Sequence, residues 1–323
     1  MIARPGLLGA LMLIGVGFAP QDAPAQETHR GILVEKLHAA LADEAEAFTG
    51  VAGWHVLDLT TGETFSHNED LIFPQGSSIK ITVLLELFRR GDLQPGLLST
   101  RLPIRESDMV GGSGVLRHLT DAGTEMSLHD LAIYMILYSD NTATNLLIDY
   151  LGMARVNGMA SALGAPSTVL QRKMIQSAAS ARGDENLSTP LEATAIMAAI
   201  ARCDLPMSEA SCFRVQEILE IPKGGAFADP LPTAVPVAWK PGGITGVATA
   251  WGIVGLERRP YAISVMTNYG SSDTVDGRYG RGGELVRRVS GLVFDYFTKL
   301  DGATEYGTRV SPSLMRRVRG GGN

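Results

Sequence analysis

The sequence predicts an α/β protein in which an antiparallel sheet flanked by helices is interrupted by an all-helical lobe. Residues 53–70, "GWHVLDLTTGETFSHNED", contain two alternating segments around a Thr-Thr-Gly turn, the pattern of an antiparallel hairpin. A second hairpin pattern covers residues 246–270, near the other end of the chain. The segments between these hairpins have mostly helical periodicity, so strands flank a helical region on both sides.

Helix boundaries along the chain are marked by capping residues. Ser127 precedes an apolar run, and Thr189 begins a capping box with a proline at the first helical position. Gly152 and Gly164 are typical of helix ends. Near the C-terminus, residues 283–300 have the periodicity of an amphipathic helix.

These patterns divide residues 28–300 into two lobes of one domain. The α/β lobe comprises residues 30–75 and 190–300, and the helical lobe comprises residues 76–189. A cleft between two such lobes is the natural place for a ligand. Residues 301–323 lack periodicity, and we expect them to form a disordered tail without an assigned role.

The composition fits a globular protein with a substantial core and excludes several functional classes. The 323 residues are 45% hydrophobic and 19% charged. A net charge of -6, with no basic stripe, argues against a nucleic-acid partner. All six histidines precede residue 130 without HxH or HExxH spacing, so we expect neither a metal site nor a cofactor. We expect a monomer that acts on a small molecule.

The first residues have the pattern of a secretory signal peptide, which we assign to residues 1–25. Arg4 is followed by the apolar run 6–18 and by Ala-Pro-Ala at positions 23–25. This run is shorter than the roughly 20 residues that span a membrane, although a permanent anchor is the alternative. We therefore expect cleavage near Ala25, a mature chain without a membrane span, and a secreted or periplasmic location.

Cys203 and Cys212 are the two cysteines of the chain, and they lie between two helical patterns. A disulfide across this turn is the expectation for an oxidising compartment, and two unpaired buried thiols are the alternative. Neither their spacing nor their neighbours suggest a metal site.

The stretch "FPQGSSIKIT", residues 73–82, places a lysine in apolar surroundings, where a charged residue needs a partner. If this stretch is helical, Ser77 and Lys80 share a face, whereas Ser78 points about 100° away. Ser77 is then a candidate nucleophile, and Lys80, with a pKa lowered by desolvation, is the candidate base that removes its proton. The plainer interpretation is an N-cap serine followed by a surface lysine.

A second polar cluster, Ser139-Asp140-Asn141, lies between two helical patterns. A hydroxyl at this place can relay a proton to a leaving group, and an asparagine amide can bind a substrate carbonyl. Alternatively, Asp140 or Asn141 caps the next helix, and the two interpretations are compatible.

A third cluster, beginning at Lys240, lies just before the second hairpin in "VAWKPGGITG". Gly242 and Gly243, if they lie on an edge strand, allow a substrate backbone to approach closely, and the lysine supplies positive charge. The plainer interpretation is an ordinary turn that leads into a strand.

The three clusters resemble the motif set of the penicillin-interacting serine enzymes, above all the class A β-lactamases. That family carries S-x-x-K, S-D-N and K-T-G. Here the three motifs begin at Ser77, Ser139 and Lys240, in the same order and at similar separations. The resemblance covers about residues 33–300 and implies a β-lactamase/transpeptidase-like fold with a five-stranded antiparallel sheet.

The resemblance also implies a role for each matching residue. Ser77 would accept the acyl group with Lys80 as its base, and Ser139 would pass a proton to the leaving nitrogen. Asn141 would bind the substrate amide, and Lys240 would steer the substrate carboxylate.

The third motif departs from the family pattern at its middle position. Pro241 stands where the family has a threonine or serine whose hydroxyl binds the substrate carboxylate. Carboxylate recognition should therefore be weaker or displaced. The backbone N–H groups of Ser77 and Gly243 would still form the oxyanion hole.

A larger departure concerns the loop that carries R-x-E-x-x-L-N in class A enzymes, where the glutamate activates the deacylating water. The matching positions here are Arg172, Met174, Ser177 and Ala178. A shift of one residue brings Lys173 to the glutamate position, so a carboxylate is not restored. Asp184 and Glu185 are the alternative acids, nearer the end of the loop. The residues expected to carry out acylation are present, whereas the glutamate expected to activate the deacylating water is not.

Three functions remain open on this basis. The first is a slow β-lactamase in which Lys80 or a displaced acid activates the deacylating water. The second is a D-alanyl-D-alanine peptidase, an esterase or an amidase on the same fold. The third is a non-hydrolysing penicillin-binding or sensor protein that keeps the acyl group, because family membership predicts the acyl step better than its fate.

Overall fold

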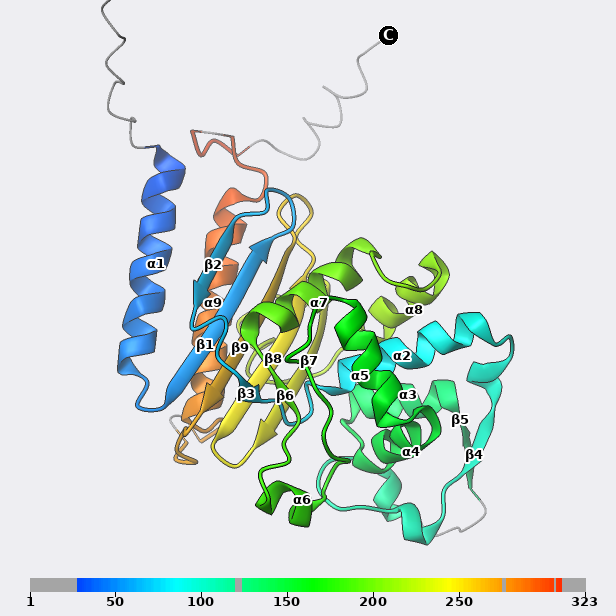
Figure 1. Cartoon of the computed structure of the whole chain (residues 1–323). Helices are drawn as coiled ribbons and strands as arrows, with labels where there is room; N and C mark the ends of the chain where they lie inside the picture. The colour runs from blue at the N-terminus through cyan, green and yellow to red at the C-terminus, as the bar shows by residue number, and fades with distance from the viewer. Residues whose placement is uncertain (1–27, 120–123, 275–276, 305, 310–323) are drawn as a thin grey trace, which may run out of the picture.

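The computed structural model describes residues 28–119, 124–274, 277–304 and 306–309 and has an antiparallel sheet at its centre (Figure 1). The sheet has five strands in the order β2-β1-β9-β8-β7. Its strands are β1 (Val51–Asp58), β2 (Thr64–His67), β7 (Val237–Ile244), β8 (Val247–Val254) and β9 (Tyr261–Asn268). Every neighbouring pair is antiparallel, so both predicted hairpins, β1–β2 and β8–β9, and the α/β class are confirmed.

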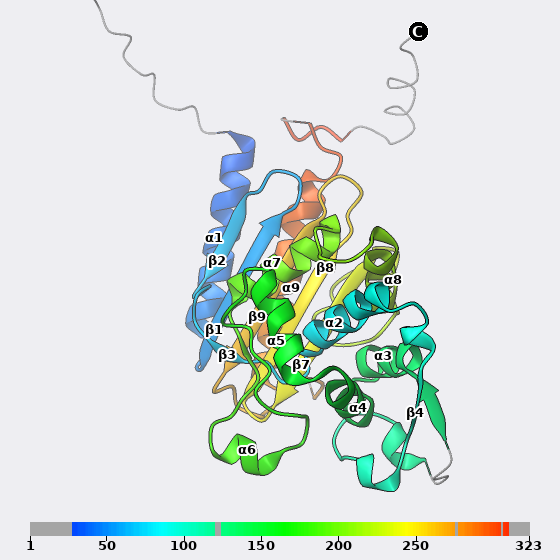
Figure 2. The ribbon, with the colours of Figure 1, turned by 45° about the vertical axis from the view of Figure 1, so that its right-hand side comes forward.

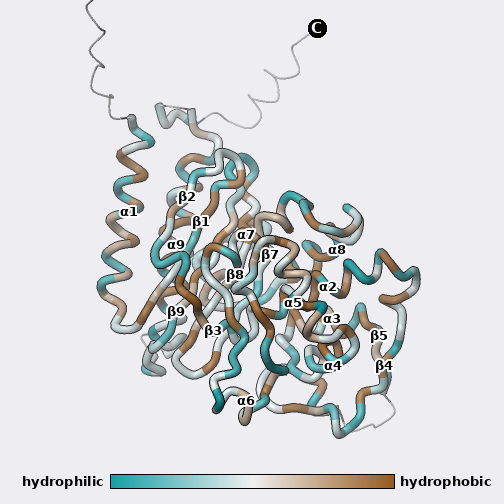
Figure 3. The backbone as a smooth tube through the Cα atoms, viewed as in Figure 1, coloured by the Kyte–Doolittle hydropathy of each residue, from teal (hydrophilic) through white to brown (hydrophobic). Residues whose placement is uncertain are grey.

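Helices cover both faces of this sheet (Figure 2). The helices α1 (His29–Ala47) and α9 (Arg281–Leu300) lie on one face, and α7 (Pro190–Arg202) lies on the other. Because side chains alternate along a strand, Trp54 is buried in the core beneath α9, whereas Leu57, three residues later, packs against the core on the α7 side. Along the outer helix α1, hydrophilic and hydrophobic stretches alternate (Figure 3), since one side of it faces solvent.

The second lobe is mostly helical. Its helices are α2 (Lys80–Leu93), α3 (Leu128–Leu137), α4 (Asn141–Leu151), α5 (Met153–Ala162) and α6 (Ser177–Ala181), with the 3-10 turns η1 (Leu97–Ser99), η2 (Glu106–Asp108) and η3 (Leu116–His118). It also contains the strands β4 (Arg101–Pro103) and β5 (Glu125–Ser127), which pair antiparallel. The expectation of an all-helical lobe is therefore corrected: strands of three residues are too short to produce a readable alternation.

Two further short strands tie the lobes together. The strands β3 (Phe73–Pro74) and β6 (Leu187–Ser188) pair where the chain enters and leaves the helical lobe. Segments far apart in the sequence thus lie side by side, directly before the Ser77 turn. This pairing fixes where that turn lies relative to the loop that carries α6.

The capping predictions are confirmed in part. Ser127 Oγ accepts a hydrogen bond from the amide of Asp130, and Thr189 Oγ1 accepts one from the amide of Glu192. Glu192 does not complete the predicted capping box, because its carboxylate accepts hydrogen bonds from residues 167 and 168 instead. A tertiary contact has replaced the local one, which the sequence pattern alone does not reveal.

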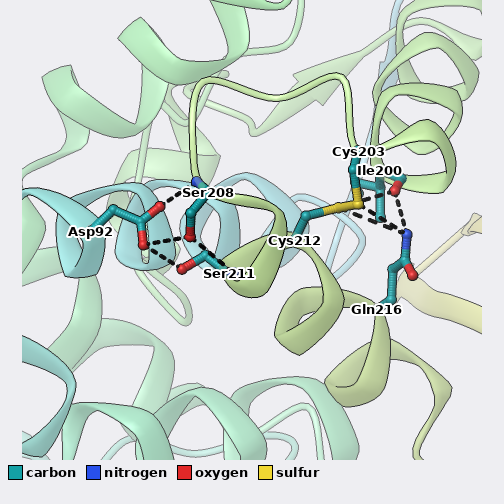
Figure 4. The surroundings of a disulfide bond; sticks show 7 residues. All are labelled: Asp92, Ile200, Cys203, Ser208, Ser211, Cys212 and Gln216. Carbon is teal, nitrogen blue, oxygen red and sulfur yellow. Dashed lines mark hydrogen bonds between the residues drawn. A yellow bond between two sulfur atoms is a disulfide. The ribbon is translucent and has the colours of Figure 1, made fainter.

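The expected disulfide joins Cys203 to Cys212 (Figure 4). It connects the end of α7 to α8 (Glu209–Glu220), the helix that packs against β7 and α2. Beside it, the amide of Gln216 donates to the carbonyl oxygen of Ile200. The cross-link therefore joins α7, which packs against β1, β8 and β9, to α8, which packs against the edge strand β7.

The ends of the chain differ from expectation in one respect. The helix α1 was not indicated by the sequence pattern, and the segment 1–25 assigned to a signal peptide lies outside the described residues. Of the tail from residue 301, residues 301–304 and 306–309 are described, and Ala303 forms a bridge with Arg309. Within the described ranges, no helix is long and apolar enough to cross a membrane.

Candidate active site

The turn that carries Ser77 precedes the first helix of the helical lobe. The helix predicted to include Ser77 begins three residues later, at Lys80, which corrects that boundary. Residues 77–80 instead form a tight turn in which the amide of Lys80 donates to the carbonyl oxygen of Ser77 over 3.3 Å. Ser77 is half-buried and lines a cleft, whereas Ser78 is fully buried.

This turn packs so closely against the edge strand β7 that glycine is required on both sides. Gly76 has φ +51°, and a Cβ there would lie 2.6 Å from the amide nitrogen of Gly243. A Cβ at Gly242 would lie 2.7 Å from the amide nitrogen of Ser78. Gly243 lines the cleft and Gly242 does not, so the structure gives Gly242 a packing role against the turn. Its contact with substrate stays a prediction.

A buried hydrogen-bond network fixes the turn to the sheet. Ser78 Oγ is 2.7 Å from Thr249 Oγ1 and 3.3 Å from the carbonyl oxygen of Lys240. The side chain of Gln75 accepts from Trp251 Nε1 over 2.9 Å and donates to the carbonyl oxygen of residue 73. No sequence motif indicated Gln75, and its full burial is visible only in the folded chain.

Lys80 is fully buried and makes three hydrogen bonds. Its Nζ donates to the carbonyl oxygen of Ser139 over 2.8 Å, to Ser139 Oγ over 3.1 Å and to Asn141 Oδ1 over 2.9 Å. Among the described residues no hydrogen bond joins it to Ser77, which corrects the expected direct contact. Three acceptors already occupy the three donors of an ammonium group. Burial lowers the pKa of Lys80 to about 7, against the opposing effect of Asp140.

Ser139 lies between the two lysines. It has φ +51° in the short connection between α3 and α4, and its Oγ also accepts a hydrogen bond from Lys240 Nζ over 3.0 Å. Lys240 lies within β7, the edge strand that directly precedes the β8–β9 hairpin as expected, and is fully buried. Burial, followed by the charges of Lys80 and Lys223, holds the pKa of Lys240 well below its usual value.

The two buried lysines are not paired with a carboxylate among the described residues, although the charge of Asp140 partly offsets the effect of burial on the pKa of Lys80. In the part of the chain that the structure describes, neither Lys80 nor Lys240 forms an ion pair with a carboxylate. Two buried cations close to one hydroxyl repel each other, which favours a neutral form of at least one of them. The arrangement is therefore suited to accept a proton and to attract an anion.

Asn141 and Asp140 connect this group to the 111–116 loop. Asn141 Nδ2 donates to the carbonyl oxygen of Gly111 over 3.0 Å, and Asn141 lines the cleft. Asp140 caps α4 through the amide of Ala143 and also accepts from the amides of Val115 and Leu116. The capping interpretation of this motif is thus correct for Asp140, while Asn141 faces the candidate site.

The cleft beside Ser77 has a volume of about 570 Å³. The residues that line it come from the Ser77 turn, the 111–116 loop, α4, β7 and the loop that carries α6: Gly76, Ser77, Gly112, Ser113, Asn141, Arg172, Met174, Ile175, Gln176, Ser177, Ser180, Ala181, Asn186, Gly243 and Ile244. The structure thus brings Ser77, Asn141 and Gly243 to one cleft, with Lys80, Ser139 and Lys240 joined to Asn141 behind it.

No carboxylate is among these described lining residues. Met174 lines the cleft, and its backbone is held by two hydrogen bonds with the side chain of Asn145. Glu185 pairs with Arg172 over 2.7 Å, and Asp184 pairs with the exposed Arg182. Neither alternative acid is among the described lining residues, although Glu185 accepts hydrogen bonds from Arg172 and Ser180, which both line the cleft.

The position predicted for the asparagine of the loop motif does not face the cleft either. Ala178 is exposed and is absent from the lining, whereas Asn186 lines the cleft and is buried. Asn186 Oδ1 accepts hydrogen bonds from the amides of residues 171 and 172 and so closes the loop on itself. Of the described residues, no group of three or more His, Cys, Asp or Glu side chains could hold a metal ion.

Known proteins share both sequence and fold with this chain. β-Lactamase L2 of Stenotrophomonas maltophilia is 36% identical over 107 residues, which are 33% of this chain and 35% of that protein. The chain thus matches about a third of the length of this relative. The crystal structure of a β-lactamase from Sphaerobacter thermophilus has 29% identity and a TM-score of 0.72, covering 82% of this chain and 97% of that one.

A second solved structure is a mutant of PBP-A, an acyl-enzyme complex with penicillin G. It has 25% identity and a TM-score of 0.73 and covers 82% of this chain and 97% of that one. Both structures share the α/β fold with the antiparallel sheet described above. A sequence model of the beta-lactamase enzyme family matches residues 35–297. This chain therefore belongs to the beta-lactamase enzyme family, as its three motifs predicted.

Proposed function

We propose that this protein is an active-site-serine hydrolase of class A β-lactamase type, acylated at Ser77 by β-lactams and slow to hydrolyse the acyl-enzyme. The observation that carries the proposal is the pair of buried lysines on either side of Ser139, neither of which forms an ion pair with a carboxylate among the described residues. Such a group can remove, relay and return one proton. We further propose that residues 1–25 direct export to the periplasm or the outside of the cell, where the protein would encounter β-lactams and peptidoglycan-like acyl donors.

In the proposed acylation, neutral Lys80 accepts the proton of the Ser77 hydroxyl while Oγ bonds to the substrate carbonyl carbon. The backbone N–H groups of Ser77 and Gly243 would hold the oxyanion. The ring C–N bond then breaks, and the nitrogen takes a proton from Ser139, which regains one from Lys80 over 3.1 Å. Because Lys80 is held by Ser139 and Asn141 in the free protein, the Ser77 contact must form when substrate binds.

Lys240 is proposed to attract the substrate carboxylate. It is buried without an anionic partner among the described residues, so an incoming carboxylate would stabilise its charged form. Pro241 offers no hydroxyl at the neighbouring position, which removes one hydrogen bond to that carboxylate. We therefore propose carboxylate binding that depends on charge more than on hydrogen bonding.

A second candidate is a penicillin-binding protein that keeps its acyl group, or a D-alanyl-D-alanine peptidase, esterase or amidase with another acceptor. The observation in its favour is the cleft whose described lining holds no carboxylate, since hydrolysis needs a base for the attacking water. The solved neighbour PBP-A, a mutant of which was captured as an acyl-enzyme with penicillin G, supports keeping this candidate.

The proposal is tested with benzylpenicillin and a chromogenic cephalosporin. Acylation should be fast and deacylation slow, because the acylating groups are present and a base for water is missing from the described lining of the cleft. We expect a burst of one acyl group per chain followed by slow turnover, with the adduct visible by intact-mass spectrometry. A stable adduct with no turnover would favour the second candidate. Absence of any adduct and any turnover would overturn both.

The role of Lys80 predicts a pH dependence. The base is the neutral amine, and burial lowers its pKa to about 7, so acylation by penicillin at low concentration should rise as the pH increases through about 7 and level off above it. Lys80→Ala should slow acylation by about 10² or more and abolish this rise. A flat profile in the native protein, or near-normal acylation of Lys80→Ala by stopped-flow measurement, would show that another group is the base.

A further inference from the structure

We propose that Ile175 is a specificity-determining residue which, with Met174 and Ile244, selects acyl donors whose acyl substituent is uncharged and apolar. This inference rests on the proposed function, because it concerns the acyl group that Ser77 would carry. It adds the chemical class of that group, which neither the motifs nor the family assign.

The position of the cleft relative to the lysines identifies which part of the substrate it receives. Ser77 and Gly243 line the cleft, but Lys80, Ser139 and Lys240 do not. In the proposed reaction the leaving nitrogen takes its proton from Ser139, so it lies on the lysine side of Ser77. The acyl substituent must then extend the other way, into the volume of about 570 Å³ bounded by the loop that carries α6. This loop lies at the lower edge of the molecule in Figures 1 and 2.

Ile175 is held in this cleft by an unfavourable backbone conformation. Its φ is +62°, a region that β-branched residues rarely adopt. The conformation is maintained by its neighbours: the backbone of Met174 is bonded twice to Asn145, and Lys173 pairs with Asp149 over 2.9 Å. Such strain persists where the surroundings over-determine it, and it is often associated with function.

The side chain of Ile175 reaches across the cleft to the opposite loop. A Cβ added at Gly112 would lie 3.0 Å from its Cδ1, so glycine at position 112 leaves room for it. Ile175 is nevertheless 49% exposed, because the rest of its side chain borders the cleft. Ile244, 40% exposed on β7, contributes a second apolar surface to the same cleft.

The charges around the cleft exclude an ionic partner for the acyl substituent. Among the described residues that line it, Arg172 is the one with a charged side chain. Its guanidinium is bound by Glu185 through Nε and Nη2, at 3.2 and 2.7 Å. A charged substituent would therefore lose its hydrating water on entering the cleft without gaining a counter-ion there, which is unfavourable. An apolar substituent would cover the exposed parts of Ile175 and Ile244 instead.

The test compares acylation by benzylpenicillin and by carboxybenzylpenicillin, which differ by one carboxylate on the acyl substituent. Second-order acylation rates from intact-mass time courses should favour benzylpenicillin about tenfold or more in the native protein, the preference that about 1.4 kcal/mol of desolvation would produce. Ile175→Gly relieves the positive φ, so it should fold at least as stably, and the preference should fall severalfold. Ile175→Lys should move the preference toward carboxybenzylpenicillin, and the matched Ile175→Val should keep it.

The outcomes separate this inference from the proposed function. Equal rates for the two penicillins in the native protein would overturn the inference while leaving acylation at Ser77 intact. An unchanged preference in a folded Ile175→Gly, verified by thermal unfolding, would also overturn it. Failure of both penicillins to acylate the native protein would overturn the proposed function, and the inference with it.

Discussion

Ser77→Ala is expected to abolish covalent labelling by a fluorescent penicillin, whereas Ser78→Ala should retain most of it. Ser77 is half-buried, lines the cleft and has a hydroxyl that makes no hydrogen bond within the described residues. Ser78 is fully buried, and its hydroxyl is bonded to Thr249 and to the carbonyl oxygen of Lys240. Without the Ser77 hydroxyl, no other group in this turn can form the ester.

The measurement is in-gel fluorescence after a fixed labelling time, with the thermal midpoint of each variant as a control. Ser78→Ala removes buried hydrogen bonds and should cost about 1 kcal/mol of unfolding free energy. Its labelling rate should fall only to the extent that loss of these hydrogen bonds displaces Ser77. Equal loss of labelling in two equally folded variants would remove the reason for choosing Ser77 as the nucleophile.

Met174→Glu is expected to accelerate deacylation by up to about 10² to 10⁴, the range associated with a general base. Met174 lines the same cleft as Ser77, and no described residue of that lining carries a carboxylate. Glu185 already neutralises Arg172, so a glutamate there would not be paired with that arginine. Because Met174 is only 6% exposed, the new carboxylate would have to turn toward the cleft to activate a water. The burst expected of the native protein should then be replaced by steady turnover, and the adduct should disappear from intact-mass spectra.

Two further variants separate the effect of the new carboxylate from the other effects of changing this loop. Met174→Gln has the same shape without the base, so its adduct should persist as in the native protein. Adding Ala178→Asn, the second change that the loop motif suggests, should add little, because Ala178 is exposed outside the cleft. If Met174→Glu folds, acylates normally and turns over no faster than Met174→Gln, the missing loop acid is not what limits hydrolysis.

Several features follow from the sequence because they depend on nearby residues. The caps at Ser127 and Thr189 bond to amides three positions away, and each begins the predicted helix. The two hairpins follow from alternation and turn residues, and the disulfide spans a short connection. The order of the three motifs was sufficient to predict the family, since that match concerns residue identity and spacing.

The site itself was decided by contacts between distant segments. Lys240 and Ser139 are 101 positions apart and meet within 3.0 Å, and Ser78 reaches the backbone of Lys240 from 162 positions away. The close approach of the Ser77 turn to β7 likewise requires glycine at position 242. Contacts between distant segments also occupy Lys80 with Ser139 and Asn141 instead of Ser77.

The loop that carries α6 shows most clearly which features of the site the sequence alone does not predict. The sequence by itself determined that Met174 and Ala178 stand where a glutamate and an asparagine are expected. Only the tertiary structure decided that Met174 faces the cleft, that Ala178 does not, and that Ile175 is held at positive φ. Periodicity and capping are properties of a few neighbouring residues, whereas the direction of a loop side chain is set by what the rest of the chain packs against it.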